Sequence, residues 1–354
     1  MNNIKRIGIL TSGGDAPGMN AAIRAATRSA LENGLEVMGI KSGYHGLLKN
    51  EMIPLGARDV SYIINRGGTM LYTARSESFK TDEGVDKAVE ILRENGIDAL
   101  ICMGGDGTYR GAYEISKRGL PTIGVPCTID NDVACTDATI GFDTAMNTVV
   151  ELVDKIRDTG ESHARCNVVE VMGRHAGDIA LQTALATGAV SAIVNEFEFD
   201  VESCVKRMIE SRANGKRNFI IIVCEGKGSE YGEKLAALLS DQTKIEARFS
   251  RLGYIQRGGS PSLRDRVLAT QMGCAAVQAI LDGNTNDVIC LKGNSMVITE
   301  MKFAITLDNY VKNRYTKEEK DAIPANTMFE IKKIVAEKEA YKSYLYETAS
   351  RISL

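Results

Sequence analysis

The chain has 354 residues, of which 44% are hydrophobic and 25% are charged, and its formal net charge at pH 7 is -3. This composition is enough to bury a substantial core, and the length suggests about two domains. The slightly acidic balance excludes a general attraction to nucleic acid or to an anionic membrane, because both favour a clustered basic excess. The sequence contains no run of about twenty apolar residues and opens without a signal-peptide pattern, so we expect a cytoplasmic protein without a membrane segment.

Cysteine and histidine usage limits the chemistry further. The eight cysteines form no Cys-x-x-Cys pair, and only three histidines occur. Scattered cysteines indicate reduced thiols rather than a disulfide framework, and the scarcity of histidine argues against a zinc site. The 34 glycines against six prolines predict many tight turns, which suit ligand-binding loops in an α/β protein.

Short apolar runs alternate with helix-like segments over the first two thirds of the chain. Strands are predicted at residues 7–10, 37–40, 99–103, 122–125, 168–171 and 219–223. Helices are predicted at residues 20–33, 111–117, 144–157, 178–187 and 201–212. This alternation is typical of parallel βαβ units and predicts doubly wound sheets of the α/β class.

The charged segment after Thr316 has a helical pattern, because Met328, Ile331, Val335 and Leu345 recur at roughly helical spacing among lysines and glutamates. We predict a packing helix there and assign it no chemistry. No linker rich in Pro, Gly or Ser and no internal repeat divides the chain. We place a first domain boundary near residue 140.

Two glycine-rich turns each follow a predicted strand and precede a helical segment. The first glycine turn reads Thr-Ser-Gly-Gly-Asp-Ala-Pro-Gly-Met-Asn at residues 11–20, and the second reads Gly-Gly-Asp-Gly-Thr at residues 104–108. Such a turn directs backbone N–H groups and the positive end of a helix toward a possible phosphate. A tight turn without a ligand explains one of them equally well, whereas two in one chain favour phosphate binding. Neither has the spacing of a Walker A loop or of a Rossmann Gly-x-Gly-x-x-Gly turn.

The second glycine turn carries candidate groups for nucleotide binding. Gly107 lets a phosphate chain approach the backbone closely. Asp106 is a suitable ligand for Mg²⁺, which usually combines one or two carboxylates with substrate phosphates and waters. A solvated turn aspartate is the alternative interpretation of Asp106.

Two carboxylates follow the predicted strand at residues 122–125, in the acidic turn Thr-Ile-Asp-Asn-Asp at residues 128–132. Open α/β sheets bind ligands at such carboxyl ends. In phosphoryl transfer the attacking hydroxyl must lose a proton while negative charge spreads over the moving phosphoryl group. We therefore assign Asp130 as the general base, with Asp132 in a supporting role.

Single arginines can supply the cations that such a reaction needs. Planar guanidinium groups bind phosphate in a bidentate way, although any one arginine is more often a surface residue. The inference therefore depends on their contexts taken together. The candidates are Arg75, Arg165, Arg174, Arg248 and Arg257.

Six segments together resemble the bacterial ATP-dependent 6-phosphofructokinases (the phosphofructokinase A family) along nearly the whole chain. Besides the two glycine turns and the acidic turn, they are Ile-Asn-Arg-Gly-Gly at residues 64–68, Val-Glu-Val-Met-Gly-Arg at residues 169–174 and Ile-Gln-Arg-Gly-Gly-Ser-Pro at residues 255–261. The resemblance implies a glycolytic kinase that transfers the γ-phosphate of ATP to the 1-hydroxyl of D-fructose 6-phosphate, giving fructose 1,6-bisphosphate and ADP. It also implies Mg²⁺ as the cofactor and a homotetramer with active sites shared between subunits.

The resemblance further implies two Rossmann-like three-layer α/β/α domains with mainly parallel sheets. Residues 1–140 and about 258–305 are expected to form the ATP-binding domain. Residues 141–257 and about 306–354 are expected to form the fructose 6-phosphate-binding domain, which includes the helical tail.

Residues that match the family's motifs are expected to have the corresponding roles. The nucleotide site is expected at Gly14, Tyr44, Arg75, Ser76, Gly105, Asp106, Gly107 and Thr108, with Asp106 at the magnesium position. The catalytic candidates are Asp130 as the base, Thr128, Asp132, Arg174 and Arg75. The sugar-phosphate site is expected at Thr128, Ile129, Asp130, Met172, Gly173, Arg174, Glu225, Tyr254, Ile255, Gln256 and Arg257. Arg165 and Arg248 match arginines that the family contributes to this site from a neighbouring subunit.

Three positions bear on the phosphoryl donor and on substrate affinity. Pyrophosphate-dependent members, the alternative function, carry Asp where Gly107 stands and Lys where Cys127 stands. Gly107 leaves room for the α-phosphate and favours ATP, and we expect Cys127, which replaces the glycine usual in ATP users, to be tolerated. Tyr254 replaces a histidine of many members and can alter affinity for the sugar phosphate, because it donates a hydrogen bond without a positive charge; a side chain turned away is the alternative.

The regulatory site is expected to differ from that of the family. Arg24, Arg28, Arg157 and Lys216 match basic positions of the pocket for ADP or phosphoenolpyruvate, whereas Ala57, Tyr62, Val190 and Asn214 replace charged residues. Val190 removes a carboxylate that the ADP-type effector complex uses to hold Mg²⁺. We predict weakened or altered allosteric control.

Two other functions remain open. Another Gly-Gly-Asp-Gly kinase, acting on NAD or on a lipid, would share the second glycine turn but should lack the sugar-site motifs at residues 128–132 and 172–174. A noncatalytic, nucleotide-sensing homologue would keep the fold without turnover, but the intact Asp106, Asp130 and Arg174 speak against it.

Overall fold

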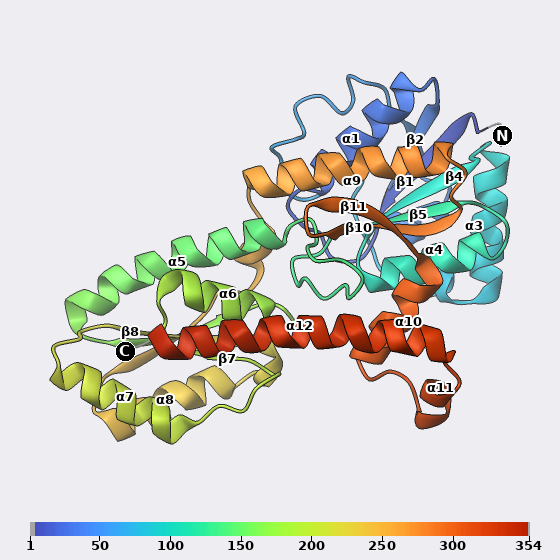
Figure 1. Cartoon of the computed structure of the whole chain (residues 1–354). Helices are drawn as coiled ribbons and strands as arrows, with labels where there is room; N and C mark the ends of the chain where they lie inside the picture. Colours follow the sequence, from blue (N-terminus) through green and yellow to red (C-terminus); the bar gives the residue numbers. More distant parts are fainter. Residues whose placement is uncertain (1–3, 353–354) are drawn as a thin grey trace. The chain divides into compact units, whose positions relative to one another are not determined.

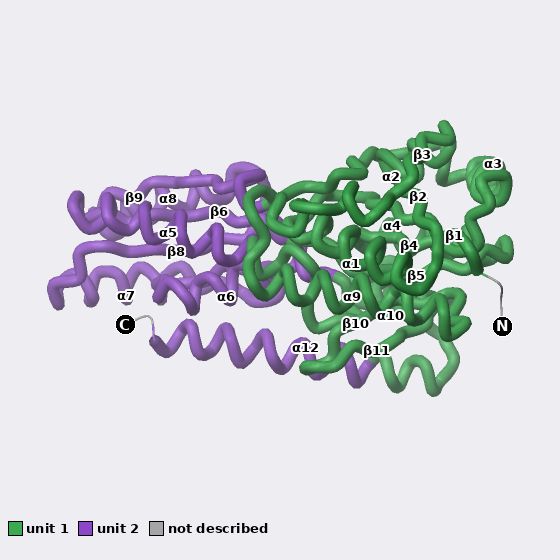
Figure 2. The backbone as a smooth tube through the Cα atoms, turned by 90° about the horizontal axis from the view of Figure 1, so that it is seen from above, with its two compact units in different colours: residues 1–129, 133–144, 257–331 green, residues 130–132, 145–256, 332–354 purple. Residues whose placement is uncertain are grey.

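The computed structural model describes residues 4–352 and divides them into two compact units, which Figure 2 colours separately. Unit 1 contains the described residues up to Ile129, together with Val133–Thr144 and Arg257–Ile331. Unit 2 contains Asp130–Asp132, Ala145–Gln256 and the described residues from Lys332 onward. The chain passes from unit 1 to unit 2 for the last time after Ile331, whereas we expected this crossing near residue 305. The reason is that α10 (Met301–Val311) packs on α4 (Asp106–Ser116) and β10 (Asn286–Lys292) of unit 1.

The sheet of unit 1 has seven strands in the order β11-β10-β5-β4-β1-β2-β3. The five inner strands, β10, β5, β4, β1 and β2, pair in parallel, whereas β3 and β11 pair in the antiparallel direction at the two edges. β4 is buried at every position, as parallel strands with helices on both faces are. The strand bounds are Arg6–Thr11 for β1, Glu36–Ile40 for β2, Met52–Pro54 for β3, Ala99–Gly104 for β4, Thr122–Pro126 for β5 and Ser295–Glu300 for β11.

Helices cover both faces of this sheet (Figure 1). On one face α1 packs closely on α9, because a Cβ at Gly273 would lie only 2.7 Å from the carbonyl oxygen of Ala22. α3 and α4 pack on each other, and α4 contacts β4 and β5. The bounds are Met19–Glu32 for α1, Gly43–Leu47 for α2, Ser78–Lys80 for the 3₁₀ helix η1, Asp82–Glu94 for α3, Leu263–Leu281 for α9 and Lys317–Asp321 for α11.

One helix of unit 1 begins earlier than the sequence pattern predicted. We predicted a helix at residues 111–117, but α4 starts at Asp106. Gly105 has an extended backbone and forms the N-cap, so the strand turns into a helix within the second glycine turn. The difference matters, because the turn then coincides with the first turn of a helix.

The sheet of unit 2 has four parallel strands in the order β7-β8-β6-β9. The inner strands β6 (Cys166–Val171) and β8 (Phe219–Cys224) are buried at every position. The remaining elements of the unit are α6 (Asp178–Thr187), β7 (Ser191–Ile193), α7 (Val201–Ala213), the 3₁₀ helix η2 (Glu225–Lys227), α8 (Tyr231–Thr243) and β9 (Ala247–Arg251). α5 (Phe142–His163), the 3₁₀ helix η3 (Gly253–Arg257) and α12 (Ala325–Ile352) each contribute residues to both units.

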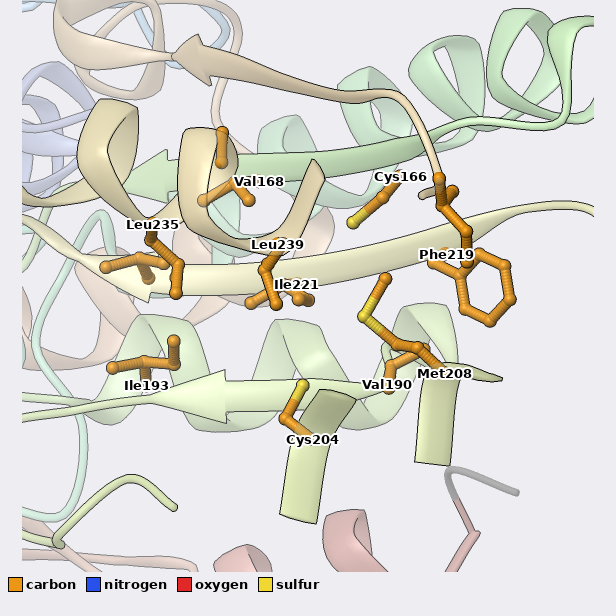
Figure 3. Packing of buried hydrophobic residues seen from close by; sticks show 13 residues of the cluster. Cys166, Val168, Val190, Ile193, Cys204, Met208, Phe219, Ile221, Leu235 and Leu239 are labelled. Atoms are coloured by element: carbon orange, nitrogen blue, oxygen red, sulfur yellow. The ribbon is translucent and has the colours of Figure 1, made fainter. Parts of the chain in front are cut away.

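The core of unit 2 lies between its sheet and helices α7 and α8, as Figure 3 shows. Phe219 and Ile221 of β8 contribute to one cluster with Met208 of α7 and Leu239 of α8, and all four are fully buried. Complete burial of such a side chain contributes about 1.5 to 3 kcal/mol relative to exposure. Every cysteine is free, in agreement with the prediction of reduced thiols.

The charged tail forms the long helix α12, as its apolar spacing predicted. Ile331 and Leu345 are buried, whereas Met328 and Val335 are only partly so. Among residues 4–352, no helix combines the length and the apolar character that a membrane crossing requires.

Candidate active site

The two glycine turns meet at the carboxyl edge of the unit 1 sheet. β1 and β4 are parallel neighbours, with Thr11 opposite Met103, so their turns leave the sheet side by side. The Thr108 hydroxyl donates a hydrogen bond to the carbonyl oxygen of Ser12 at 3.1 Å. Gly104 lies so close to Ser12 and Thr108 that a Cβ there would clash with both. The two turns therefore form one continuous surface.

The N-terminus of α4 in this surface is suited to an anion. Gly105 caps the helix without a side-chain hydrogen bond, so the first backbone N–H groups of α4 are not capped by their own N-cap side chain. A Cβ at Gly105 or at Gly107 would meet no atom within 4 Å. Open space above uncapped N–H groups and the positive helix end is the arrangement that phosphate groups bind.

Asp106, the first residue of α4, lies in a cluster of charged side chains that no sequence motif indicated. Its Oδ2 is 2.7 Å from Nη1 of Arg314 and 3.6 Å from Nζ of Lys312. Asp308 shares both cations, at 3.2 Å from Arg314 and 2.8 Å from Lys312. The missed cations lie some two hundred positions from Asp106, in the loop after α10, where no local motif marks them.

The same cluster sets the protonation of its two acids. Burial alone would raise the pKa of Asp106, but the charges of Lys312 and Arg314 outweigh burial and hold this pKa well below its ordinary value. For Asp308 burial prevails over the same cations and raises the pKa to about 6. Asp106 therefore stays ionised well below neutral pH, whereas Asp308 takes up a proton as the pH falls through about 6.

The donor set of the second glycine turn fits Mg²⁺ bound together with a nucleotide. Within residues 4–352 no group of three or more His, Cys, Asp or Glu side chains gathers as a metal site would require. Mg²⁺ in nucleotide sites needs only one or two carboxylates, because phosphates and waters supply the other ligands. The ionised carboxylate of Asp106 beside an anion-binding helix end meets that requirement, once Arg314 moves from it.

The other predicted nucleotide residues lie around the glycine turns in different ways. The guanidinium of Arg257 approaches the Cα of Gly14, and a Cβ there would be 3.4 Å from its Nη1. Tyr44 is buried and stacks on Phe79, and its hydroxyl donates a hydrogen bond to the carbonyl oxygen of Thr108 at 2.6 Å. It therefore supports the second glycine turn from the protein interior. Arg75 is exposed, whereas the Ser76 hydroxyl lies 3.2 Å from that of Ser78 and accepts from the N–H of Phe79 at 3.3 Å.

The acidic turn follows β5 and places its central carboxylate beside an arginine. Asp130 is 2% exposed, and its Oδ2 lies 3.1 Å from Nε of Arg174. Asn131 adopts a left-handed backbone with φ of 52°, which asparagine tolerates better than most residues. Thr128 is anchored through its carbonyl oxygen by the hydroxyl of Thr139 at 2.6 Å, and Asp132 is half-buried.

Arg174 lies on the loop between β6 and α6, residues 172–177, which we call the Arg174 loop. Gln256, fully buried, accepts a hydrogen bond from the N–H of Met172 at 3.1 Å. Glu225 accepts one from the N–H of Arg174 at 2.7 Å. Gly173 and Arg174 both have positive φ, at 129° and 54°. The predicted sugar-site residues Glu225 and Gln256 thus hold the backbone of this loop.

The remaining sugar-site candidates differ in their exposure. Arg165 and Arg248 both pair with Glu246, the former at 2.7 Å, so the structure brings these two arginines together. Tyr254 and Ile255 are 79% and 61% exposed. Ile129 is buried.

The regulatory candidates are distributed over both units. In unit 2, burial, Arg157 and Arg207 lower the pKa of Lys216. A pocket of about 250 Å³ lies beside them, lined by Arg207, Glu210, Ser211, Asn214 and Lys216. In unit 1, Arg24 and Arg28 are carried by α1, and Arg28 donates to the carbonyl of Ala57 at 3.2 Å.

Two units with mainly parallel sheets, and a pair of glycine turns at one edge of the unit 1 sheet, define a doubly wound α/β protein with an edge that is suited to anions. A family model described as phosphofructokinase matches residues 6–280. The chain belongs to the phosphofructokinase family.

Individual relatives agree with this membership. The chain is 50% identical over 305 residues to "ATP-dependent 6-phosphofructokinase 1" of Clostridium perfringens, covering 86% of this chain and 95% of the relative. It is 51% identical over 296 residues to "ATP-dependent 6-phosphofructokinase" of Shouchella clausii, covering 83% and 92%. Among solved structures, phosphofructokinase from Saccharomyces cerevisiae matches 98% of this chain with a TM-score of 0.85 and 32% identity. The match spans only 50% of that yeast chain.

Proposed function

We propose that the protein is an ATP-dependent 6-phosphofructokinase, which transfers the γ-phosphate of ATP to the 1-hydroxyl of fructose 6-phosphate. The names of the bacterial relatives at about 50% identity support this activity. The structural observation that carries the proposal is Asp130, a buried carboxylate paired with Arg174 at 3.1 Å. A kinase that shared only the second glycine turn would have no reason to keep this pair.

Unit 1 is proposed to bind ATP. Phosphates would lie on the N–H groups at the start of α4, where Gly105 and Gly107 leave space. Asp106 would hold Mg²⁺, which when bound bridges phosphate oxygens and reduces their negative charge. Arg75 is proposed as a further phosphate ligand, because the hydroxyl of Thr73 on the same loop donates to the carbonyl oxygen of Gly13 at 2.6 Å. Arg257 keeps its predicted role as a ligand of the sugar phosphate.

Unit 2 is proposed to bind fructose 6-phosphate and to supply the base. Asp130 would accept the proton of the 1-hydroxyl, and Arg174 would keep this carboxylate ionised and oriented. Arg165 and Arg248 would bind the 6-phosphate of a neighbouring subunit's substrate in a homotetramer. Both arginines pair with Glu246, so they lie close enough together to bind one phosphate group.

Regulation is proposed to be weakened in a cytoplasmic enzyme. The basic pocket near Lys216 can attract an anionic effector, but Val190 is an apolar, buried residue that offers no carboxylate to an effector-bound cation. The test compares velocity curves with and without ADP and phosphoenolpyruvate. A shift of half-saturation by fructose 6-phosphate as large as in responsive relatives would contradict this part of the proposal.

The activity is tested by comparing ATP with pyrophosphate as donors, and fructose 6-phosphate with NAD as acceptors. We expect fastest turnover with ATP and fructose 6-phosphate, and Asp130→Ser should lower kcat by about 10²- to 10⁴-fold. Faster turnover with pyrophosphate than with ATP would overturn the assignment of ATP as the phosphoryl donor. Binding of both substrates without formation of fructose 1,6-bisphosphate would favour the noncatalytic homologue, and near-parental turnover of Asp130→Ser would remove the proposed base.

A further inference from the structure

The helix α12 lies outside residues 6–280, the part of the chain that the family model matches. From Lys332 onward this helix belongs to unit 2. Lys342 Nζ lies 2.6 Å from Oδ2 of Asp178 and 2.8 Å from Oε1 of Glu196. Tyr346 stacks on Phe197 with ring centroids 4.5 Å apart. The helix is thus fixed to the first turn of α6 and to the segment after β7.

The carboxylate that Lys342 binds also holds the Arg174 loop. Oε1 of Glu196 accepts a hydrogen bond from the N–H of Gly177 at 2.9 Å. The approach is close, because a Cβ at Gly177 would lie 2.6 Å from Oε2 of Glu196. Gly177 is the N-cap of α6, and it has no side chain with which to cap the helix. Glu196 therefore links α12 directly to the backbone at the end of the Arg174 loop.

The Arg174 loop needs such support from its surroundings. Arg174 has a left-handed backbone, which is unfavourable for a residue with a side chain and persists only where neighbouring structure fixes it. On one side Glu225 accepts from the N–H of Arg174. On the other side Glu196 accepts from that of Gly177. The loop is thus held by Gln256 at Met172, by Glu225 at Arg174 and by Glu196 at Gly177.

Glu196 can keep this position because Lys342 neutralises it. Asp178 and Glu196 are only 14% and 24% exposed in their side chains, and both face the same ammonium group. Without that cation the two poorly hydrated carboxylates would repel each other. Glu196 would then turn toward water and release the N–H of Gly177.

We propose that Lys342 is a positioning residue for fructose 6-phosphate binding, acting through Glu196 on the Arg174 loop, an inference that rests on the proposed fructose 6-phosphate site of unit 2. The tail helix is thereby part of the acceptor site's support. We expect the effect of Lys342 on the sugar side, because Lys342 and both carboxylates that it pairs with belong to unit 2.

The test compares Lys342→Met with Lys333→Met, a matched substitution of an exposed lysine on the same helix. Two quantities are measured: amide hydrogen exchange of a peptide covering residues 172–178, and the KM values for both substrates. We expect faster exchange in Lys342→Met alone and an increase in the fructose 6-phosphate KM of about three- to thirtyfold, with the ATP KM within about twofold. Lys342→Arg, which keeps the charge, should restore most of the affinity.

The proposal is overturned if folded Lys342→Met shows parental exchange and parental fructose 6-phosphate KM, or if both KM values rise equally. If Lys342→Met does not fold, Glu196→Ala is used instead, since it removes both the ion pair with Lys342 and the acceptor of the Gly177 N–H. Unchanged exchange and KM in that variant would equally overturn the proposal. A parent protein without fructose 6-phosphate turnover would refute the proposed function, whereas the exchange comparison would still decide whether Lys342 supports the loop.

Discussion

Arg314 and Asp106 form an ion pair at 2.7 Å, between the loop after α10 and the first residue of α4. The pair occupies the carboxylate that would hold Mg²⁺, so Arg314 competes with the metal. Arg314→Ala should lower the Mg²⁺ concentration for half-maximal activity by about two- to fivefold, which corresponds to the free energy that a partly exposed ion pair contributes. Magnesium titrations at saturating ATP measure this, with Arg93→Ala, an exposed arginine of α3, as the control. A higher magnesium requirement would instead make Arg314 a ligand of the metal–nucleotide complex.

Gly107→Asp should change donor binding without changing the fold. A Cβ at Gly107 meets open space, and an acidic side chain in the first turn of a helix is favourable for stability. The carboxylate would project where phosphates approach α4, so kcat/KM for ATP should fall by about ten- to a hundredfold through charge repulsion and lost space. Steady-state kinetics and a thermal unfolding curve separate the two effects. A variant that kept parental ATP kinetics would show that the nucleotide does not pass over this position.

Cys127→Gly should leave the donor preference unchanged. The Cys127 side chain is 1% exposed, and its backbone N–H donates to the carbonyl of Gly104 at 3.0 Å. Burial raises the pKa of its thiol, so the group stays neutral and packs as a small apolar residue. Removing it should cost about 1 to 2 kcal/mol in the free energy of unfolding. A changed ratio of ATP to pyrophosphate turnover would contradict this, as would unaltered stability in denaturant unfolding.

The sequence predicted the elements whose signal is local and strong. β4 and β8 are apolar runs that are buried throughout, so their composition alone marks them. β6 is buried throughout as well, and Val168, Val169 and Val171 mark it although Asn167 and Glu170 interrupt its apolar sequence. β9 was missed because its residues alternate between partly buried and exposed at a sheet edge. α9 was missed because it buries small residues such as Ala269 and Gly273 against α1, which gives a weak amphipathic pattern.

The same distinction between local and long-range signals applies to the residues of the site. The glycine turns and the acidic turn are contiguous motifs, so Asp106 and Asp130 could be named from the sequence. Arg314 and Lys342 could not, because each reaches its partner across a distance of more than a hundred residues along the chain. Their role depends on where α10 and α12 dock, and docking is decided by tertiary packing rather than by local spacing.

Glu196→Gln should lose stability in a pH-dependent way. Burial alone would raise the pKa of Glu196, but the charge and hydrogen bond of Lys342, with the Gly177 N–H, outweigh burial and leave it below its ordinary value of 4.5. An acid with a lowered folded-state pKa stabilises the fold above its unfolded value, and this contribution is lost as pH falls through the folded-state value. The variant should therefore cost about 1 to 2 kcal/mol at pH 7 and progressively less below pH 4.5. Denaturant unfolding of parent and variant at pH 7 and below pH 4.5 measures the loss of stability at each pH. Glu339→Gln, at an exposed position of α12, is the control. Equal losses at neutral and acidic pH would mean that the ion pair between Glu196 and Lys342 does not contribute to the free energy of unfolding.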